Sequence, residues 1–236
     1  MKFLQAVLRV LFYIAVGGVI SIAGAAFFFM HWEPDREKHP LRGIDVSHHQ
    51  GEINWQQVAG DDVAFAYIKA SEGGDFRDTA FETNYRGATG VGLPWGAYHF
   101  FSLCKTGAAQ AANFLNALPG DLPMLAPVLD LEFKGNCARR PPQKDVVREI
   151  AHFVTLVEQA TGQGVILYVP KPFYEVYMKG ESVNRRIWAR SIWRSPGYVK
   201  KWSLWQYHMR GKVAGINGDV DLNVLASDLP LSGLKK

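Results

Sequence analysis

The sequence predicts an α/β fold: a modified (β/α) barrel with eight strands and an incomplete ring of helices, preceded by an apolar N-terminal helix. Three observations predict it. Short apolar runs rich in β-branched and aromatic residues recur after residue 42, helical patterns lie between several of them, and almost every run ends in a polar residue. This alternation of strand and helix is typical of parallel sheets. A doubly wound sheet is the alternative fold with the same alternation.

Residues 1–30 are the most apolar part of the chain. Lys2 and Arg9 are their only charged residues, and the run from Val10 to Met30 has none. A helix of about 20 apolar residues spans a bilayer. Because both charges lie at the N-terminal side, the positive-inside rule keeps that end in the cytoplasm and places the rest of the chain outside it.

This apolar segment has three interpretations. It is an uncleaved anchor, which makes the chain a single-pass protein of the inner membrane, or a signal peptide cleaved near the A-x-A sequence at 23–25, or a buried core helix. The apolar run continues past 25 to Met30, which is long for a cleaved signal and favours the anchor. We predict a signal-anchor helix over 1–30, a linker with Pro34 and Pro40 over 31–41, and one domain over 42–236.

The domain contains the predicted strands and helices. The strands are expected at 43–47, 63–71, 95–101, 125–132, 165–169, 187–190, 204–208 and 220–224. One helix should follow Thr106 as N-cap and end before Pro119. A second should begin with Asp145 as cap, bury Val146, Ile150, Phe153, Val154 and Val157, and end at Gly162. Connections after 169 are short, so late strands should follow one another without full helices.

Composition limits the partners of this domain. The net charge is +4, and because Lys2 and Arg9 supply two of these charges, the exported part carries only +2. Without a basic stripe, nucleic acid is not expected as a partner. The sequence has no phosphate-binding glycine loop and no Cys/His zinc spacing, so we expect no cofactor and no metal. We expect a monomer.

Cys104 and Cys137 are the only cysteines. Each follows a predicted strand, so both would lie at one edge if these strands are parallel neighbours. An exported domain can hold a disulfide bond. The sequence leaves open whether the two residues form one or remain free thiols.

The polar strand ends predict a site. In a parallel barrel the carboxyl ends of the strands form one face, where active sites lie. The most informative motif is the run 128–132, in which Asp130 and Glu132 alternate with Leu129 and Leu131. Because side chains alternate along a strand, both carboxylates point to one side of it. Close carboxyl groups have separated pKa values, so one can donate a proton while the other is charged.

An acid and an anion beside one bond are what glycoside hydrolysis requires. We expect Glu132, which lies further out with a longer side chain, to be the acid, and Asp130 to be the anion. The alternatives for this pair are an ion pair with Lys69 or Arg190 and a site for a divalent cation. Asp45, at the end of the first strand, should face the pair across the barrel as a third catalytic carboxylate.

Several sequence motifs follow one another along the domain: GIDVSHHQG at 43–51, YIKASEG at 67–73, GAYHF at 96–100, VLDLE at 128–132, LWQY at 204–207 and GDVDLN at 218–223. In this order they resemble the motifs of the glycoside hydrolase family 25 lysozymes. The resemblance covers about residues 42–226. One departure is Ser191, where many members of the family have an aromatic residue after the WAR sequence at 188–190. No wall-binding repeat is recognisable after residue 226.

The resemblance implies a modified α/β barrel and cleavage of the β-1,4 bond between N-acetylmuramic acid and N-acetylglucosamine in peptidoglycan glycan strands. It implies acid and base catalysis by Glu132 and a nucleophilic or stabilising role for Asp130. It also implies that Asp221 and Tyr98 belong to the site. With them we expect Lys69, Tyr168 and Gln206 to bind substrate.

Two other functions remain compatible with the fold. One is a catalytically silent barrel that only binds glycans, although such a barrel has no need of the Asp130–Glu132 pair. The other is a chitinase-like hydrolase of another N-acetylated polymer, because an Asp-x-Glu sequence on a barrel strand also suits substrate-assisted catalysis. The Asp45 motif speaks against the chitinase.

Overall fold

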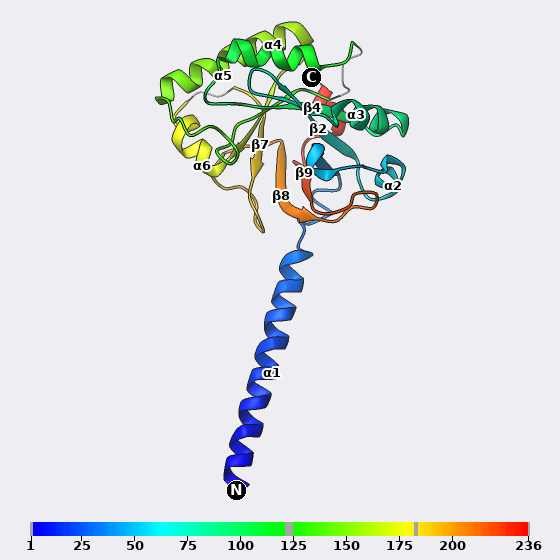
Figure 1. Cartoon of the computed structure of the whole chain (residues 1–236), viewed down its shortest axis with the longest axis vertical. Helices are drawn as coiled ribbons and strands as arrows, with labels where there is room; N and C mark the ends of the chain where they lie inside the picture. The colour runs from blue at the N-terminus through cyan, green and yellow to red at the C-terminus, as the bar shows by residue number, and fades with distance from the viewer. Residues whose placement is uncertain (1, 121–124, 182–183, 236) are drawn as a thin grey trace. The chain divides into compact units, whose positions relative to one another are not determined.

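The computed structural model describes residues 2–120, 125–181 and 184–235, which belong to two units, Met1–Glu33 and Pro34–Lys236. The first unit is helix α1 (Lys2–Met30) (Figure 1). Its part Phe3–Phe29 is long and apolar enough to cross a membrane, and none of its most apolar window is buried in the structure. A helix that is apolar on all sides and packs against no core has the properties of a membrane anchor or a signal sequence.

The second unit is a closed barrel. Its sheet contains β1 (Arg42–Val46), β2 (Phe65–Glu72), β3 (Phe76–Arg77), β4 (Trp95–Phe100), β5 (Val128–Asp130), β6 (Ile166–Pro170), β7 (Ile187–Arg190), β8 (Leu204–Gly211) and β9 (Val220–Leu225). The barrel closes because β1 pairs with β2 on one side and with β9 on the other. Without β3, a short hairpin partner of β2 that the sequence did not reveal, eight strands form the barrel. The predicted fold is confirmed.

One of the eight barrel strands runs antiparallel to its neighbours. Neighbours from β1 and β2 through β4 to β8 are parallel, whereas β9 is antiparallel to both β8 and β1. The connection between β8 and β9 is residues 212–219, and a parallel crossover needs about a dozen residues or more. The beginning of β9 therefore lies at the edge where the other strands end. Asp221, the second residue of β9, therefore lies at that edge although it stands near the start of its strand.

Alternating side chains fill the barrel interior. Its core contains Phe65 and Tyr67 of β2, Val128 of β5, Ile166 and Tyr168 of β6, Trp188 of β7 and Leu204 of β8. Two glycines make room for the largest rings. A Cβ at Gly43 would lie 2.2 Å from the ring of Phe65, and one at Gly96 would lie 2.4 Å from the ring of Tyr67. The aromatic core therefore depends on the glycines of the neighbouring strands.

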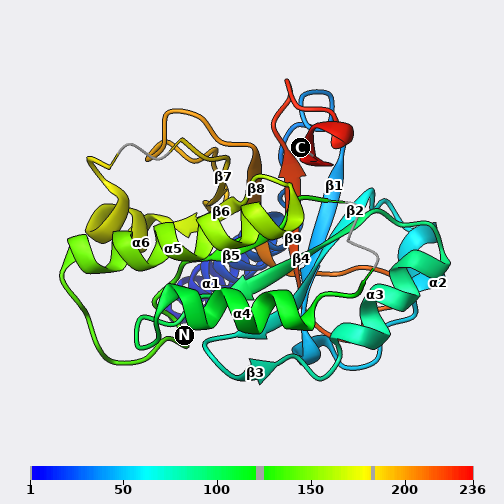
Figure 2. The ribbon, with the colours of Figure 1, turned by 90° about the horizontal axis from the view of Figure 1, so that it is seen from above.

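The helical ring is incomplete, as predicted. Helices α2 (Trp55–Gly60), α3 (Phe81–Gly90), α4 (Gly107–Ala117) and α5 (Gln143–Thr161) follow the early strands, while β6 is followed only by the short α6 (Lys171–Phe173) and a π-helical turn, Tyr174–Met178. Short 3-10 helices occupy His48–Gln50 and Leu231–Lys235. Figure 2 shows α4 and α5 side by side over the strands. No helix lies between β7 and β8 or between β8 and β9 in the described part of the chain.

The two predicted helices form, with one difference. Thr106 caps α4 by accepting a hydrogen bond from the Ala109 amide, and the five apolar residues predicted for α5 are its buried face. Asp145 is not the cap of α5, which begins at Gln143 after Pro142. Proline has a fixed φ that suits the start of a helix, so the helix starts earlier and Asp145 lies in its first turn.

Helices α2 and α3 were not predicted. The first has six residues, too few for a periodic pattern, and the second contains Gly87 and Gly90, which weaken helical propensity. Packing explains the glycine at position 87, because a Cβ there would lie 2.2 Å from the ring of Trp55. Tertiary contact between the two helices therefore compensates for the short length of α2 and the weak helical propensity of α3.

Part of the predicted linker packs against the barrel. From Pro34 onward the chain belongs to the barrel unit. His39 Nδ1 lies 2.8 Å from the carbonyl oxygen of Leu225, Arg36 forms an ion pair with Asp62, and Leu41 packs on the barrel core.

A disulfide bond joins Cys104 and Cys137, whose Cα atoms are 6.2 Å apart. Cys104 lies in the loop after β4 and Cys137 in the loop after β5. These strands are parallel neighbours, so the bond joins two loops at the carboxyl edge of the barrel.

Removing this bond should destabilise the protein. The bridge spans a sequence separation of 33 residues, and restricting such a loop in the unfolded chain is worth about 3 to 4 kcal/mol. Thermal unfolding of the full-length chain in detergent micelles should therefore show a lower Tm for Cys104→Ala/Cys137→Ala than for the wild type. Reductant should lower the wild-type Tm to that of the variant and leave the variant unchanged, and a wild-type Tm that does not respond to reductant would contradict the prediction.

Candidate active site

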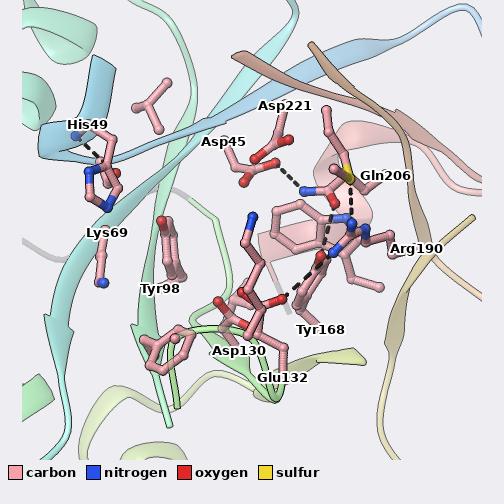
Figure 3. Close-up of a pocket in the computed structure, with 18 of the residues that line it drawn as sticks. Asp45, His49, Lys69, Tyr98, Asp130, Glu132, Tyr168, Arg190, Gln206 and Asp221 are labelled. Atoms are coloured by element: carbon pink, nitrogen blue, oxygen red, sulfur yellow. Dashed lines mark hydrogen bonds and ion pairs between the residues drawn. The ribbon is translucent and has the colours of Figure 1, made fainter. Parts of the chain in front are cut away.

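The carboxyl edge of the barrel contains a pocket of about 430 Å³ (Figure 3). All the predicted site residues line it: Asp45, Lys69, Tyr98, Asp130, Glu132, Tyr168, Gln206 and Asp221. They come from strands on all sides of the barrel, so only closure of the sheet brings them together.

Asp130 points into the pocket because of the strand alternation. It is the last residue of β5, two positions after Val128, which belongs to the barrel core. Leu129 and Leu131 are buried and, by the alternation, lie on the opposite face. Strand β5 is shorter than predicted, since Pro127 has no N–H for the sheet and the strand begins after it. Glu132 therefore lies just beyond the strand, at the open side of the pocket.

Asp130 is a buried carboxyl group without a full set of partners. It is 8% exposed, and among the described residues its Oδ1 has no hydrogen-bond partner. Burial, with the nearby carboxylates of Glu132 and Asp45, raises the pKa of Asp130 well above its usual value. A buried acceptor without a donor is costly, so this oxygen is available to a donor from a substrate.

Glu132 is more open than Asp130, as its predicted role requires. Its side chain is 20% exposed, and Oε2 lies 3.7 Å from Arg190 Nη1. Burial raises the pKa of Glu132, and the positive charges of Arg190 and Lys134 oppose this shift. The group thus keeps its proton to a higher pH than a free glutamic acid and can reach a bond held in the pocket.

Asn136 holds the Glu132 loop. Its Nδ2 donates to the carbonyl oxygens of Glu132, at 2.9 Å, and Phe101, at 2.7 Å. Its Oδ1 accepts the amides of Leu103 and of the disulfide-bonded Cys137. Asn136 thus joins the loops after β4 and β5 beside the disulfide bond and positions Glu132. Asn136 was not among the predicted site residues.

Asp45 and Asp221 form a carboxyl pair across two strands. They are direct partners in the antiparallel register of β1 and β9. Asp45 Oδ2 accepts hydrogen bonds from Gln206 Nε2 at 3.1 Å and from Asn223 Nδ2 at 2.7 Å. Burial and the charge of Asp45 raise the pKa of Asp221 to about 9, and burial also raises the pKa of Asp45. At neutral pH the pair therefore shares a proton.

Gln206 connects Asp45 to Tyr168. The Tyr168 hydroxyl donates to Gln206 Oε1 at 2.9 Å, while Gln206 Nε2 donates to Asp45. Both polar ends of this buried amide are thus used within the protein. This favours a positioning role for Gln206 over the substrate contact that we predicted.

Lys69 lines the pocket but does not pair with the two catalytic candidates. Its Nζ is 2.7 Å from Glu72 Oε2 and 5.1 Å from the ring centre of Phe100. Of the two ion pairs considered for the Asp130–Glu132 pair, only the one between Arg190 and Glu132 forms.

Two tyrosines offer neutral hydroxyl groups to the pocket. Burial, followed by the charge of Asp45, raises the pKa of Tyr98 well above its usual value. Burial, followed by the charge of Glu132, has the same effect on Tyr168. Both hydroxyls therefore stay protonated. The Tyr98 hydroxyl can donate a hydrogen bond, whereas the Tyr168 hydroxyl already donates to Gln206 Oε1 and can accept one.

Two further residues of the site were not among the predicted ones. Asn223 orients Asp45 and itself accepts a hydrogen bond from Trp188 Nε1 at 3.0 Å. Its position two residues after Asp221 is a signal that could have revealed it, because both lie on one face of the strand. Arg190 was noted only as a strand end and an alternative ion-pair partner, and its contact with Glu132 depends on the barrel.

Known proteins resemble this chain over most of its length. The sequence model described as "Glycosyl hydrolases family 25" matches residues 44–216. Lysozyme M1 of Streptomyces globisporus is 33% identical over 196 residues, which cover 78% of this chain and 67% of that protein. The uncharacterized protein YegX of Escherichia coli K12 is 35% identical over 196 residues, 79% of this chain and 70% of that protein. A family 25 glycosyl hydrolase from Bacillus anthracis superposes with a TM-score of 0.75 and 36% identity over 83% of this chain and 92% of its own.

The raised pKa of Asp221 predicts how stability depends on pH. The pKa of Asp221 is about 9 in the folded protein and 3.8 ordinarily. Between these two pH values the folded state therefore keeps a proton on Asp221 that the unfolded state has lost. The free energy of unfolding should therefore fall as pH rises from about 4 to about 9. Asp221→Asn removes the charge, so its Tm should exceed that of the wild type at pH 8 and approach it at pH 4.

Thermal unfolding of the full-length chain at pH 4, 6 and 8 checks this prediction. The matched control is Asp228→Asn, which removes a largely exposed carboxylate paired with Lys201 and should shift stability by only about 0.5 kcal/mol or less. The prediction is wrong if Asp221→Asn is no more stable than the wild type at pH 8.

Proposed function

Because this chain belongs to glycosyl hydrolase family 25, we propose that Glu132 and Asp130 catalyse its hydrolysis of peptidoglycan. The chain is a glycoside hydrolase of the lysozyme type and cleaves the β-1,4 bond between N-acetylmuramic acid and N-acetylglucosamine. The observation that carries the assignment of residues is the pair of carboxyl groups at the end of β5, both in one pocket and both with raised pKa.

In the first step Glu132 acts as the general acid. Its raised pKa keeps a proton available, and its place at the open side of the pocket suits a donor to the glycosidic oxygen. As the bond to the leaving sugar breaks, positive charge develops at the anomeric carbon and the ring oxygen. In the second step the Glu132 carboxylate accepts a proton from the water that attacks this carbon, which restores the acid.

Asp130 stabilises the positive charge that develops at the anomeric carbon. It either attacks this carbon as a nucleophile or orients the N-acetyl group, whose carbonyl oxygen then attacks. The free Oδ1 suits the second route, since it can accept the N–H of the acetamido group. In either route Asp130 lowers the barrier in its ionised form, because a charge on this buried carboxyl group is little screened by water.

The Asp45–Asp221 pair has a supporting role. The negative charge of Asp45 helps to raise the pKa of Glu132, and the hydrogen bonds from Gln206 and Asn223 fix the Asp45 carboxylate. With Tyr98 and Tyr168, the pair offers donors and acceptors to sugar hydroxyl groups.

The Asp130–Glu132 pair argues against a silent glycan-binding barrel but does not exclude a chitinase. A silent glycan-binding barrel would carry the cost of buried carboxyl groups with raised pKa without using them. A chitinase would need the same pair, and the product analysis below distinguishes it from a muramidase.

Glu132→Gln should abolish hydrolysis. Glutamine preserves the shape of the side chain but cannot donate the proton, so kcat on purified peptidoglycan should fall by about 10²- to 10⁴-fold. Released reducing ends are measured with the full-length chain in detergent micelles, and borohydride reduction followed by mass analysis should identify muramic acid at the new end. Reduced glucosamine ends would identify a different bond specificity.

The matched control is Glu82→Gln on α3, an exposed glutamate paired with Arg86, which should retain full activity. Circular dichroism and Tm should show that both variants are folded. Wild-type activity in Glu132→Gln would refute the catalytic assignment.

We further propose that α1 is an uncleaved anchor that holds the enzyme in the inner membrane as a single-pass, monomeric protein with the barrel outside the cytoplasm. The long apolar surface of the helix supports this, and peptidoglycan lies on the outer side of that membrane. In this arrangement the anchor keeps the enzyme close to its substrate.

The anchor predicts that the mature protein retains its N-terminus. Mass analysis of the membrane fraction should detect peptides from residues 3–29, and carbonate washing should not release the protein. Ala23→Leu/Ala25→Leu removes the A-x-A sequence and should change neither the size nor the location of the protein. Wild type that is shorter and released, while this variant remains in the membrane, would show that the segment is a cleaved signal.

A further inference from the structure

A second pocket, which we call the basic pocket, lies beside the active site. It has a volume of about 440 Å³ and is lined by the segment after β6 and the loop after β7. Because these strands are parallel neighbours, both segments lie at the edge that contains the active pocket. Arg190 lines both pockets and pairs with Glu132. The basic pocket is therefore adjacent to the active pocket.

The charge of the basic pocket is opposite to that of the active pocket. Its charged lining residues are Lys171, Lys179, Arg190, Arg194 and one carboxylate, Glu175. Glu175 lies 3.6 Å from Lys171 Nζ and so balances that lysine. Lys179 and Arg194 are exposed, and no ion pair within the described part of the chain involves their side chains. Two cationic groups thus remain for a ligand.

The wall of the basic pocket is held in place. The Tyr198 hydroxyl donates to the carbonyl oxygen of Val169 at 2.5 Å and accepts the amide of Arg190 at 3.0 Å. Its ring lies 5.5 Å from that of Tyr174. Next to Arg194, the half-exposed Trp193 has a φ of 64°, a conformation that a bulky residue keeps only when its surroundings impose it. Arg194 is therefore presented by a fixed loop.

The sugar rings of the substrate do not explain these charges. In peptidoglycan the lactyl carboxyl group of muramic acid is bound in an amide, so a glycan strand with its peptides attached has no charge on the rings. Its negative charges are the free carboxylates of the peptide stems. A carboxylate is attracted by exposed Lys and Arg side chains.

We propose that the basic pocket binds the carboxylates of a peptide stem, carried by a muramic acid residue of the glycan in the active site, through Lys179 and Arg194. This inference rests on the proposed function. The stem then contributes to substrate selection, so that peptidoglycan with intact stems is a better substrate than the same glycan without them.

The test compares three forms of one substrate: soluble uncrosslinked glycan strands with stems; the same strands after an amidase has removed the stems and the lactyl carboxyl groups freed by it have been converted to methylamides; and strands whose stem carboxyl groups have been converted to methylamides. The full-length chain in detergent micelles should show a kcat/KM about fivefold higher on the first form than on either of the others, the effect of one or two exposed charge pairs. Salt should reduce this preference.

The double variant Lys179→Ala/Arg194→Ala should lose the preference, so that the ratio of its kcat/KM on strands with stems to that on strands without stems is near 1. Its kcat/KM on strands without stems should stay within about twofold of the wild-type value. The matched control is Lys200→Ala/Arg86→Ala, which removes the same charges outside both pockets and should keep the preference. Arg194→Gln is a milder variant that should lose part of it, and the Tm of each variant is measured alongside.

Three results would overturn the inference. The first is equal wild-type activity on all three forms, and the second is equal activity on the intact and methylamide forms. The third is loss of the preference in the control variant, which would assign it to overall charge. If the wild type hydrolyses strands without stems but shows no preference, only this inference fails. If it hydrolyses none of the forms, the proposed function fails, and this inference fails with it.

Discussion

The pairing of β1 with both β2 and β9 is the interaction on which the rest of this structure depends. It closes the sheet, surrounds the aromatic core with strands on all sides and brings the carboxyl ends of the parallel strands to one edge. Because β9 runs antiparallel, its first residues join that edge, and Asp221 comes to lie opposite Asp45. If β1 paired only with β2, these two residues would lie at opposite edges of an open sheet.

Closure of the barrel has an electrostatic cost. Five carboxyl groups line one pocket. Burial raises the pKa of four of them, Asp45, Asp130, Glu132 and Asp221, and the fifth, Glu72, pairs with Lys69. The protein reduces this cost by sharing protons and by hydrogen bonds from Gln206 and Asn223 rather than by ion pairing alone. The result is a set of carboxyl groups with raised pKa values, which acid catalysis requires and which a protein selected only for stability would avoid.

The loops around the pocket have two different roles. Those after β4 and β5 are joined by the disulfide bond and by Asn136, and they hold the acid Glu132. Those after β6 and β7 form the basic pocket and are held by Tyr198. Arg190 lies between the acidic and basic regions and contacts Glu132. The rigid strands position the reacting groups, and the loops decide which substrate lies beside them.

The sequence by itself determined the features that depend on local periodicity. The strand positions, the buried face of α5 and the common direction of Asp130 and Val128 follow from the alternation of side chains, which is the same in any sheet or helix. The ordered motifs predicted the family, and each predicted site residue lies in the pocket. Tertiary structure alone decided the direction of β9, the contact of Asp221 with Asp45, the ion pair of Arg190 with Glu132 and the role of Asn136. These contacts join residues far apart in the chain, and their geometry exists only after the barrel has closed.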